Sequence, residues 1–424
     1  MLSAVLFFLF AAIVSYLIYR SIVHPVVVFN ILWFVVITIS TFFVEGLGYY
    51  KPSIYIYNIF LIGGVCYNVG AILSSVISSK RSNKTTIKEF QAISIDRVRL
   101  FTIAEIILAV YYFYKAINVA NLLLSGQTYE VVRSIYFSDA NITSPLEDIS
   151  IMFIFDPLLL LTEVFFALNL FTHILPKKLN YLMLLNLALR TFLSAGRTAI
   201  FETGMLVLVS AIYLGLLKRA SIKQKMGVFA SIVTLFIFMS LITLRRHGGE
   251  TGVIETGMIS LVDYFTGSFP FFEDLLKSRD YIEPTYGLVT FGGVTDIFLH
   301  ILRTLHLSDM PLTYISTGSI LAEFRPIGYA AYYNAMPTMY YYFYTDFREL
   351  GYYICPLVFG YASAGLFRKI QQTGSLLSYT YYLFLMILVI ESSFNWQLER
   401  IPFVMGMVYV YFYLHDKRRT KVSL

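Results

Sequence analysis

About 11 apolar stretches, each close to the length that a bilayer's hydrocarbon core requires of a helix, restrict this chain to an all-α, polytopic membrane fold. With 58% hydrophobic and 14% charged residues, the composition excludes an ordinary soluble domain. The stretches lie at 3–19, 25–44, 54–79, 98–124, 149–175, 179–195, 198–217, 226–244, 338–367, 376–395 and 401–415.

The order of these stretches predicts three regions. Residues 1–244 hold about eight membrane helices, and residues 338–424 hold about three more and a basic cytoplasmic tail. Between them, residues 245–337 form a large extracytoplasmic loop. Apolar residues recur at helical spacing from Ile254 to Leu276, so we expect amphipathic helices in this loop.

The basic residues give the orientation. Alternating the stretches places nineteen of the 32 Lys and Arg residues on one side, which the excess of positive charge on cytoplasmic loops identifies as the inside. The N-terminus is then periplasmic and the C-terminus cytoplasmic. Of the remaining thirteen basic residues, ten are arginine. Arginine binds phosphate with a two-pronged, permanently charged group, so we expect an outward-facing site for an anionic substrate that carries pyrophosphate.

Two groups of arginines are candidates for this site in the first region and just after it. Arg197 lies in a turn at the start of a helix, where free backbone N–H groups also favour an anion, and Arg190 lies two helical turns earlier on a similar face. Arg245 and Arg246 end the next outward helix. Alternatively, the Arg197 side chain only extends to the membrane surface. Arg245 and Arg246 could likewise only complement the dipole at the end of their helix.

Further candidates follow the large loop. Glu323 and Arg325 end it, and an aromatic run that includes Tyr344 could stack on sugar rings or form an interfacial belt. Asp346 could accept a proton from a sugar hydroxyl or act as a fixed counter-ion for an arginine, and Arg348 follows it.

Charged residues also occur near the last turn and inside the membrane. Arg400 lies with Glu399 in a short outer turn, where either catalysis or solvation explains the charge. Lys115 and Asp156 lie at similar depths on adjacent helices and are predicted to pair. Glu105 and Glu163 are intramembrane acids that would suit a proton relay. No metal-binding or nucleotide-binding motif occurs, so we expect neither a metal nor a cofactor.

Three motifs resemble one family, the Wzy-type oligosaccharide repeat-unit polymerases of O-antigen and capsular polysaccharides. They are the turn from Ser194 to Thr198, the helix end from Leu244 to Gly248, and the run from Asn334 to Gly351. The third run resembles the family's "N-x-Y-T…F-Y-x-D-F-G-x-x-G". Arg348 stands where that run has glycine, so we expect the local backbone to differ.

The resemblance implies a metal-independent, inverting glycosyltransferase with a GT-C-like fold in the bacterial inner membrane. Such an enzyme transfers the growing glycan from undecaprenyl pyrophosphate to the next lipid-linked repeat unit at the outer face. Its partners are those lipid-linked oligosaccharides, the membrane lipids and a chain-length regulator. Arg197 and Arg246 match arginines that hold pyrophosphate in the family, and Arg400 aligns with an arginine before the last helix.

Two alternatives remain. An O-antigen ligase shares fold and carrier but transfers the glycan to lipid A core, and His300 or His306 would be its loop histidine. A flippase or secondary transporter is supported only by Glu105 and Glu163, and no internal repeat of the kind that transporters carry is visible.

Overall fold

The computed structural model describes residues 1–77, 93–127, 145–194, 198–214, 265–278, 283–329, 332–334 and 336–415. Its long helices are α1 (Leu2–Tyr19), α2 (Pro25–Phe42), α3 (Ile54–Ile77), α4 (Ile95–Leu124), α7 (Asp156–Thr172), α8 (Lys177–Ser194), α9 (Thr198–Tyr213), α17 (Gly351–Thr373), α18 (Leu376–Glu391) and α19 (Ile401–Leu414). Each predicted apolar stretch coincides with one of these helices, except 226–244, which lies outside the described residues. The all-α membrane fold is therefore confirmed, and the number of crossings stays a prediction.

Six helical runs are long and apolar enough to cross a membrane. Four are α1, α2, α3 and α4, and two are composite. One composite run joins α6 (Pro145–Ser150), the π-helical η2 (Ile151–Phe155) and α7, and the other joins α16 (Met339–Phe347), η3 (Arg348–Leu350) and α17. Three shorter apolar helices are α9, α18 and α19. Helix α8 is long enough to cross but contains three basic residues, Lys177, Lys178 and Arg190.

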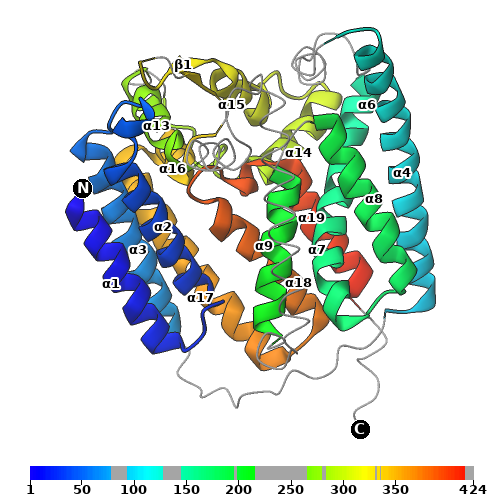
Figure 1. Ribbon diagram of the computed structural model, residues 1–424, viewed down its shortest axis with the longest axis horizontal. Coiled ribbons are helices and arrows are strands. Elements are labelled where there is room, and N and C mark those ends of the chain that lie inside the picture. Colours follow the sequence, from blue (N-terminus) through cyan, green and yellow to red (C-terminus); the bar gives the residue numbers. More distant parts are fainter. Residues whose placement is uncertain are drawn as a thin grey trace. The chain divides into compact units, whose positions relative to one another are not determined.

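The chain divides into two compact units, each built from segments far apart in the sequence. Unit 1 comprises 1–85, 259–373 and 385–401, and unit 2 comprises 86–258, 374–384 and 402–424. In unit 1, α1 packs along α2, and α17 packs along α3. These four helices lie side by side in Figure 1. The N-terminal part of the chain thus completes its packing only with a segment from the C-terminal part.

Close approach of α3 and α17 depends on two glycines. A Cβ atom on Gly360 would lie 1.9 Å from the carbonyl oxygen of Tyr67, and one on Gly70 would lie 1.9 Å from that of Leu357. Small residues allow this kind of backbone contact between helices in a membrane, where packing replaces the hydrophobic effect as the driving force. The two contacts are reciprocal, so both helices need a glycine.

Gly360→Ala should therefore destabilise unit 1 by about 1–3 kcal/mol, because the new methyl group overlaps a backbone atom that cannot rotate away. Thermal unfolding in detergent would show this as a lower melting temperature. Gly365→Ala is the matched control on the same helix, since its Cβ would meet only the Ser74 hydroxyl at 3.3 Å. Equal melting temperatures for the two variants would contradict the packing argument.

The loop segments gather at one end of unit 1, where α1 also begins (Figure 1). We call this the loop end and define it as the described residues within 43–53, 265–350 and 391–400. It contains η1 (Glu45–Leu47), α13 (Ser268–Ser278), α14 (Gly292–Thr304), α15 (Thr313–Ala322), η4 (Gln397–Glu399) and the antiparallel pair β1 (Arg325–Pro326) and β2 (Tyr332–Tyr333). A bridge between Tyr49 and Gly328 ties the segment after α2 to the β1–β2 hairpin. Three helices, α13, α14 and α15, thus lie in the described part of the segment 245–337.

Unit 2 is a helical bundle in which α8 packs against α4 and α7, and α7 against α9. Its apolar core includes Leu108 and Tyr112 of α4, Leu158 of α7 and Leu187 of α8. These residues have almost no exposed surface, as expected where bundle helices meet.

The predicted pair of Lys115 and Asp156 is wrong. The Lys115 ammonium lies 2.5 Å from the Glu147 carboxylate, and Asp156 lies 3.6 Å from Arg190. The helical run that contains α7 begins at 145 rather than 149, so Glu147 belongs to it and comes within reach of α4. Lys115 and Asp156 are both paired, but each with another partner.

Candidate functional site

Three segments of the loop end surround a group of buried acids. They are α16, the turn from 283 to 292 that leads into α14, and the turn from 391 to 400 that contains η4. Trp396 connects them, because its indole N–H donates to the carbonyl oxygen of Thr290 at 2.8 Å and its ring contacts Phe343 of α16 at 4.9 Å. These contacts fix the positions of Asp346, Glu399 and Arg400 within unit 1.

Asp346 holds the turn before α14. It has no exposed surface, and its carboxylate accepts hydrogen bonds from the Thr285 hydroxyl, from the Val289 N–H at 3.1 Å and from the Thr290 N–H at 2.5 Å. The donors are two backbone groups and a hydroxyl, rather than an arginine. Of the roles considered for Asp346, this geometry favours a fixed structural acceptor over a group that takes a proton from a sugar.

Asp296 has a similar structural role on α14. Its side chain is fully buried and accepts a hydrogen bond from the Thr313 N–H at 2.7 Å, at the first residue of α15. An acidic side chain at a helix start satisfies a free N–H group and complements the helix dipole. Asp296 therefore fixes α15 to α14.

Glu399 is the third acid of the group and differs from the other two. Its exposed fraction is 7%, whereas Asp296 and Asp346 have none. Burial raises the pKa of Glu399 to about 8, and the negative charges of Asp296 and Asp346 act in the same direction. A hydrogen bond with Tyr342 and the charge of Arg400 oppose this shift without cancelling it. Glu399 is thus a carboxyl group that exchanges a proton near neutral pH.

Hydrogen bonds to Asn395 hold the turn beside Glu399. The Trp396 N–H donates to Oδ1 of Asn395 at 2.8 Å, which fixes Oδ1 as an acceptor, and the Tyr342 hydroxyl lies 3.2 Å from the same atom. The Tyr342 hydroxyl thus lies beside both Asn395 and Glu399, and its contact with Glu399 favours the ionised carboxylate.

Glu391 fixes the other side of this turn. The carboxylate is fully buried, and its Oε2 accepts hydrogen bonds from Nε2 of Gln397 at 2.5 Å and from Nδ2 of Asn395 at 3.3 Å. The amide of Asn395 is thus held from both ends. Glu391, Asn395, Tyr342 and Glu399 form one chain of contacts.

Arg348 follows Asp346 in an unusual backbone conformation. Its φ of 52° and ψ of −141° lie in a region that favours glycine and strains other residues. We expected the local backbone to differ from that of a run with glycine here, and instead Arg348 keeps the positive φ of a glycine. Its guanidinium lies 5.2 Å from the centroid of the Tyr344 ring. Tyr344 also stacks on Tyr352 at 5.6 Å, so little of its ring is open to a sugar.

Arg400 ends the turn next to Glu399 and is exposed. Neither Arg400 nor Arg348 forms an ion pair within the part of the chain that the structure describes. A guanidinium without a carboxylate partner keeps its donors available for an anion. These two are therefore the predicted site arginines of unit 1 that can still bind a phosphate group.

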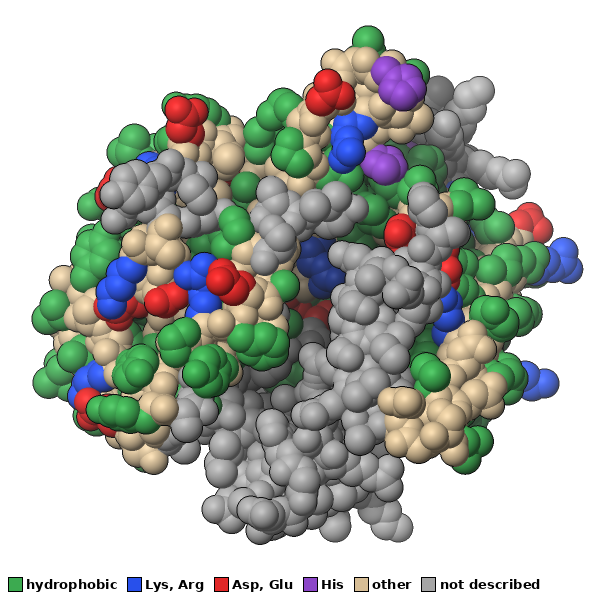
Figure 2. Space-filling view, turned by 90° about the horizontal axis from the view of Figure 1, so that it is seen from above, with side chains coloured by type: hydrophobic (Ala, Val, Ile, Leu, Met, Phe, Trp, Pro, Cys, Tyr) green, Lys and Arg blue, Asp and Glu red, His purple; other side chains and the backbone are tan. Residues whose placement is uncertain are grey.

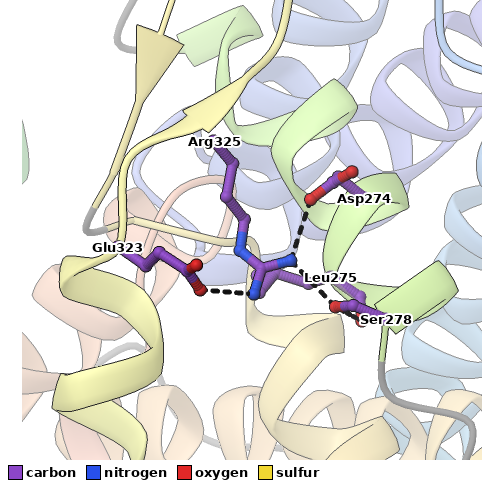
Figure 3. A network of polar contacts seen from close by, with 5 residues as sticks. All are labelled: Asp274, Leu275, Ser278, Glu323 and Arg325. Carbon is purple, nitrogen blue, oxygen red and sulfur yellow. Dashed lines mark hydrogen bonds and ion pairs between the residues drawn. The ribbon is translucent and has the colours of Figure 1, made fainter.

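Arg325 is committed to other contacts. Its guanidinium lies between α13 and the end of α15, 2.9 Å from Asp274 and 2.8 Å from Glu323, and it also donates to the Ser278 hydroxyl (Figure 3). Although burial disfavours its charge, these two carboxylates raise the pKa of Arg325. Arg325 and Glu323 thus attach the β1–β2 hairpin to α13.

Other charges of the loop end are paired in the same way. Acidic and basic side chains lie next to one another on the face seen in Figure 2, with hydrophobic side chains between them. In unit 1 these pairs include Lys51 with Glu45 at 3.4 Å and Lys277 with Glu273 at 3.1 Å. Such exposed pairs contribute little stability and leave no excess positive charge for a ligand.

The remaining predicted site residues lie elsewhere. Arg190 belongs to unit 2, where it pairs with Asp156. Arg197, Arg245 and Arg246 lie outside the described residues, so their roles stay predictions. Among the described residues, no three His, Cys, Asp or Glu side chains are grouped in a way that could hold a metal ion.

Comparison with protein families, with curated proteins and with solved structures finds no match. The site is therefore interpreted from its own geometry. The sequence pointed to Arg400 and Arg348, left Glu399 open between catalysis and solvation, did not single out Glu391, and placed Tyr342 only within an aromatic run. One signal was present, since Glu399 stands three residues after Trp396 in a turn too short and too apolar to solvate it.

Proposed function

We propose that this chain polymerises lipid-linked oligosaccharide repeat units. In this proposal it transfers the growing glycan of an O-antigen or capsular polysaccharide from undecaprenyl pyrophosphate to the next repeat unit. It does so as a metal-independent, inverting glycosyltransferase of the GT-C type, at the outer face of the bacterial inner membrane.

The observation that carries the proposal is the combination of Glu399, Arg400 and Arg348 at the loop end. A carboxyl group with a pKa of about 8 is suited to take a proton from a sugar hydroxyl near neutral pH. Two arginines without carboxylate partners are suited to a pyrophosphate. Transfer from a lipid pyrophosphate to a sugar hydroxyl needs both kinds of group.

The proposed reaction is a single displacement. The hydroxyl oxygen of the acceptor sugar attacks the anomeric carbon and forms the new glycosidic bond, while the bond from that carbon to the phosphate oxygen breaks. Ionised Glu399 takes the hydroxyl proton, and Arg348 and Arg400 stabilise the charge that develops on the departing undecaprenyl pyrophosphate. Attack from the side opposite the leaving group inverts the configuration. Arg197 and Arg246 stay candidates for further pyrophosphate contacts.

The proposed membrane arrangement follows from the charge distribution. About 11 helices cross the inner membrane, with a periplasmic N-terminus and a cytoplasmic C-terminus. The common location of the N-terminus and the loop helices at one end of unit 1 supports this arrangement. A chain-length regulator is the proposed protein partner.

Deleting the gene tests the function. We expect the surface polysaccharide to shrink to a single repeat unit on each acceptor, visible as loss of the ladder on a gel. Loss of all O-antigen from the lipid A core would instead identify a ligase, and an intermediate trapped in the inner leaflet would identify a flippase. Either result would reject the proposal.

Plasmid complementation assigns the site. The wild-type gene should restore the ladder, whereas Arg400→Ala should restore it poorly, because a lost phosphate contact in a transition state costs about 10²–10³ in rate. Arg303→Ala is the matched control, since Arg303 is an exposed arginine near the end of α14. Equal complementation by the two variants would reject the role of Arg400.

A further inference from the structure

The intramembrane acid Glu105 lies in a polar contact between three helices of unit 2. Its side chain, only 1% exposed, extends from α4 toward Thr162 of α7 and Asn186 of α8, both fully buried. Oε1 of Glu105 lies 2.5 Å from the Thr162 hydroxyl oxygen, and Oε2 accepts a hydrogen bond from Nδ2 of Asn186 at 2.7 Å. Nδ2 also donates to the backbone oxygen of Glu105 at 3.0 Å.

The number of hydrogens in this contact determines the charge of Glu105. The Thr162 hydroxyl has one hydrogen but two close oxygen neighbours, Oε1 of Glu105 at 2.5 Å and the carbonyl oxygen of Leu158 at 2.7 Å. The Leu158 carbonyl can only accept. If Thr162 donates to Leu158, the second hydrogen must come from a protonated Glu105. If Glu105 were ionised, one of these two short contacts would hold no hydrogen and would be repulsive.

The charged groups around Glu105 also indicate that it is protonated. None of the described Lys, Arg or His side chains forms an ion pair with Glu105, although an ionised carboxylate buried among helices needs a cation. Tyr413 of α19 interacts with Glu105 electrostatically, Glu163 is the neighbour of Thr162 on α7, and neither carries a positive charge. Arg97, two turns earlier on α4, donates to the carbonyl oxygens of Tyr413 and His415.

We propose that Glu105, Thr162 and Asn186 form a proton-binding site in the membrane-spanning part of unit 2. The proton lies on Oε1 of Glu105 and is shared with the Thr162 oxygen, while Asn186 holds Oε2. Oδ1 of Asn186 is buried and has no hydrogen-bond partner among the described residues, so one polar acceptor of this contact is left open. The proposal does not depend on the glycosyl transfer described above.

Infrared difference spectroscopy on the full chain in lipid tests the site, with wild type compared to Glu105→Gln at pH 7. We expect the wild type to show the C=O stretching band of a protonated carboxyl group that the variant lacks, and we expect D2O to shift this band. A wild-type-specific band of an ionised carboxylate would overturn the proposal. A protonated-carboxyl band that D2O leaves unchanged would overturn the exchange of its proton.

Two further variants keep the test interpretable. The amide of Glu105→Gln can replace both contacts of a neutral acid, so this variant should melt within a few degrees of wild type, and a large loss would indicate that the lost group was charged. Thr162→Val removes the oxygen that shares the proton and should shift the band to higher frequency, whereas an unshifted band would contradict the assignment. Glu147→Gln is the matched control, because this acid pairs with Lys115 and should lose only an ionised band.

Discussion

Glu399→Gln is expected to abolish the polysaccharide ladder and to raise the melting temperature of the protein at pH 8. The loss follows from the removal of the proposed proton acceptor, which contributes about 10²–10⁴ in rate to reactions of this kind. For wild type, we expect the transfer rate to rise with pH up to about 8 and then to level, because only the ionised form of Glu399 accepts a proton. A rate that falls over this range would contradict the role.

The gain in stability follows from the direction of the pKa shift. The folded protein holds the proton of Glu399 up to about pH 8, whereas the unfolded chain releases it near pH 4.5. The folded state is therefore favoured by this group at low pH, and that contribution is lost as pH rises from about 4.5 to about 8. Glutamine stays neutral and avoids the loss, which is ~3–5 kcal/mol at most.

Thermal unfolding in detergent at pH 5 and pH 8 would measure this difference. Wild type and Glu399→Gln should melt at similar temperatures at pH 5 and diverge at pH 8. Glu349→Gln is the matched control, since Glu349 is an exposed acid of the loop end, and it should change neither stability nor activity. When one substitution lowers activity and raises stability, the replaced residue is typically needed for function although it destabilises the fold.

Arg348→Gly is expected to stabilise the loop end while it reduces transfer. The backbone strain of a residue other than glycine at this φ and ψ is about 1–3 kcal/mol. Glycine removes it, although the greater freedom of glycine in the unfolded chain offsets about 0.5–1 kcal/mol of the gain. The guanidinium is lost, and with it about 10²–10³ in rate if it stabilises the leaving pyrophosphate.

Arg348→Ala separates the two effects. It loses the guanidinium but keeps the strain, so it should be as inactive as Arg348→Gly and should lack its stability gain. Melting temperature and ladder length would be measured for both variants. A wild-type ladder from Arg348→Gly would show that the side chain is dispensable, and a lower melting temperature would show that its contact with Tyr344 outweighs the strain.

The positions of the helices could be predicted because length and apolar content alone decide which segments can lie in a membrane. The ion-pair partners of the charged residues on these helices could not be predicted. The prediction that Asp156 pairs with Lys115 assumed that the helix begins after Glu147. In addition, the π-helical turn at 151–155 changes the direction in which the residues before it face around the helix axis. An extra turn of helix is enough to replace one partner with another.

The choice among the acids of the site depends on contacts between distant segments. Asp346 is the more prominent acid in the sequence, but a turn about 60 residues earlier supplies the donors that occupy its carboxylate. In the described part of the chain no backbone N–H donates to the Glu399 carboxyl, and two other acids lie beside it. Likewise, the sequence shows that Arg325 is charged but not that Asp274 and Glu323 enclose it. Tertiary hydrogen bonds decide which charged groups stay available.

The glycine contact between α3 and α17 sets an order of events during synthesis. Helix α3 leaves the ribosome with Ile77, but α17 begins only at Gly351. At a synthesis rate of about 5–20 residues per second, the gap lasts on the order of tens of seconds. Throughout that time lipid tails or the insertion machinery must cover the face of α3 that carries Gly70. The first helices of the nascent chain thus wait in the bilayer for a partner that arrives near the end of translation.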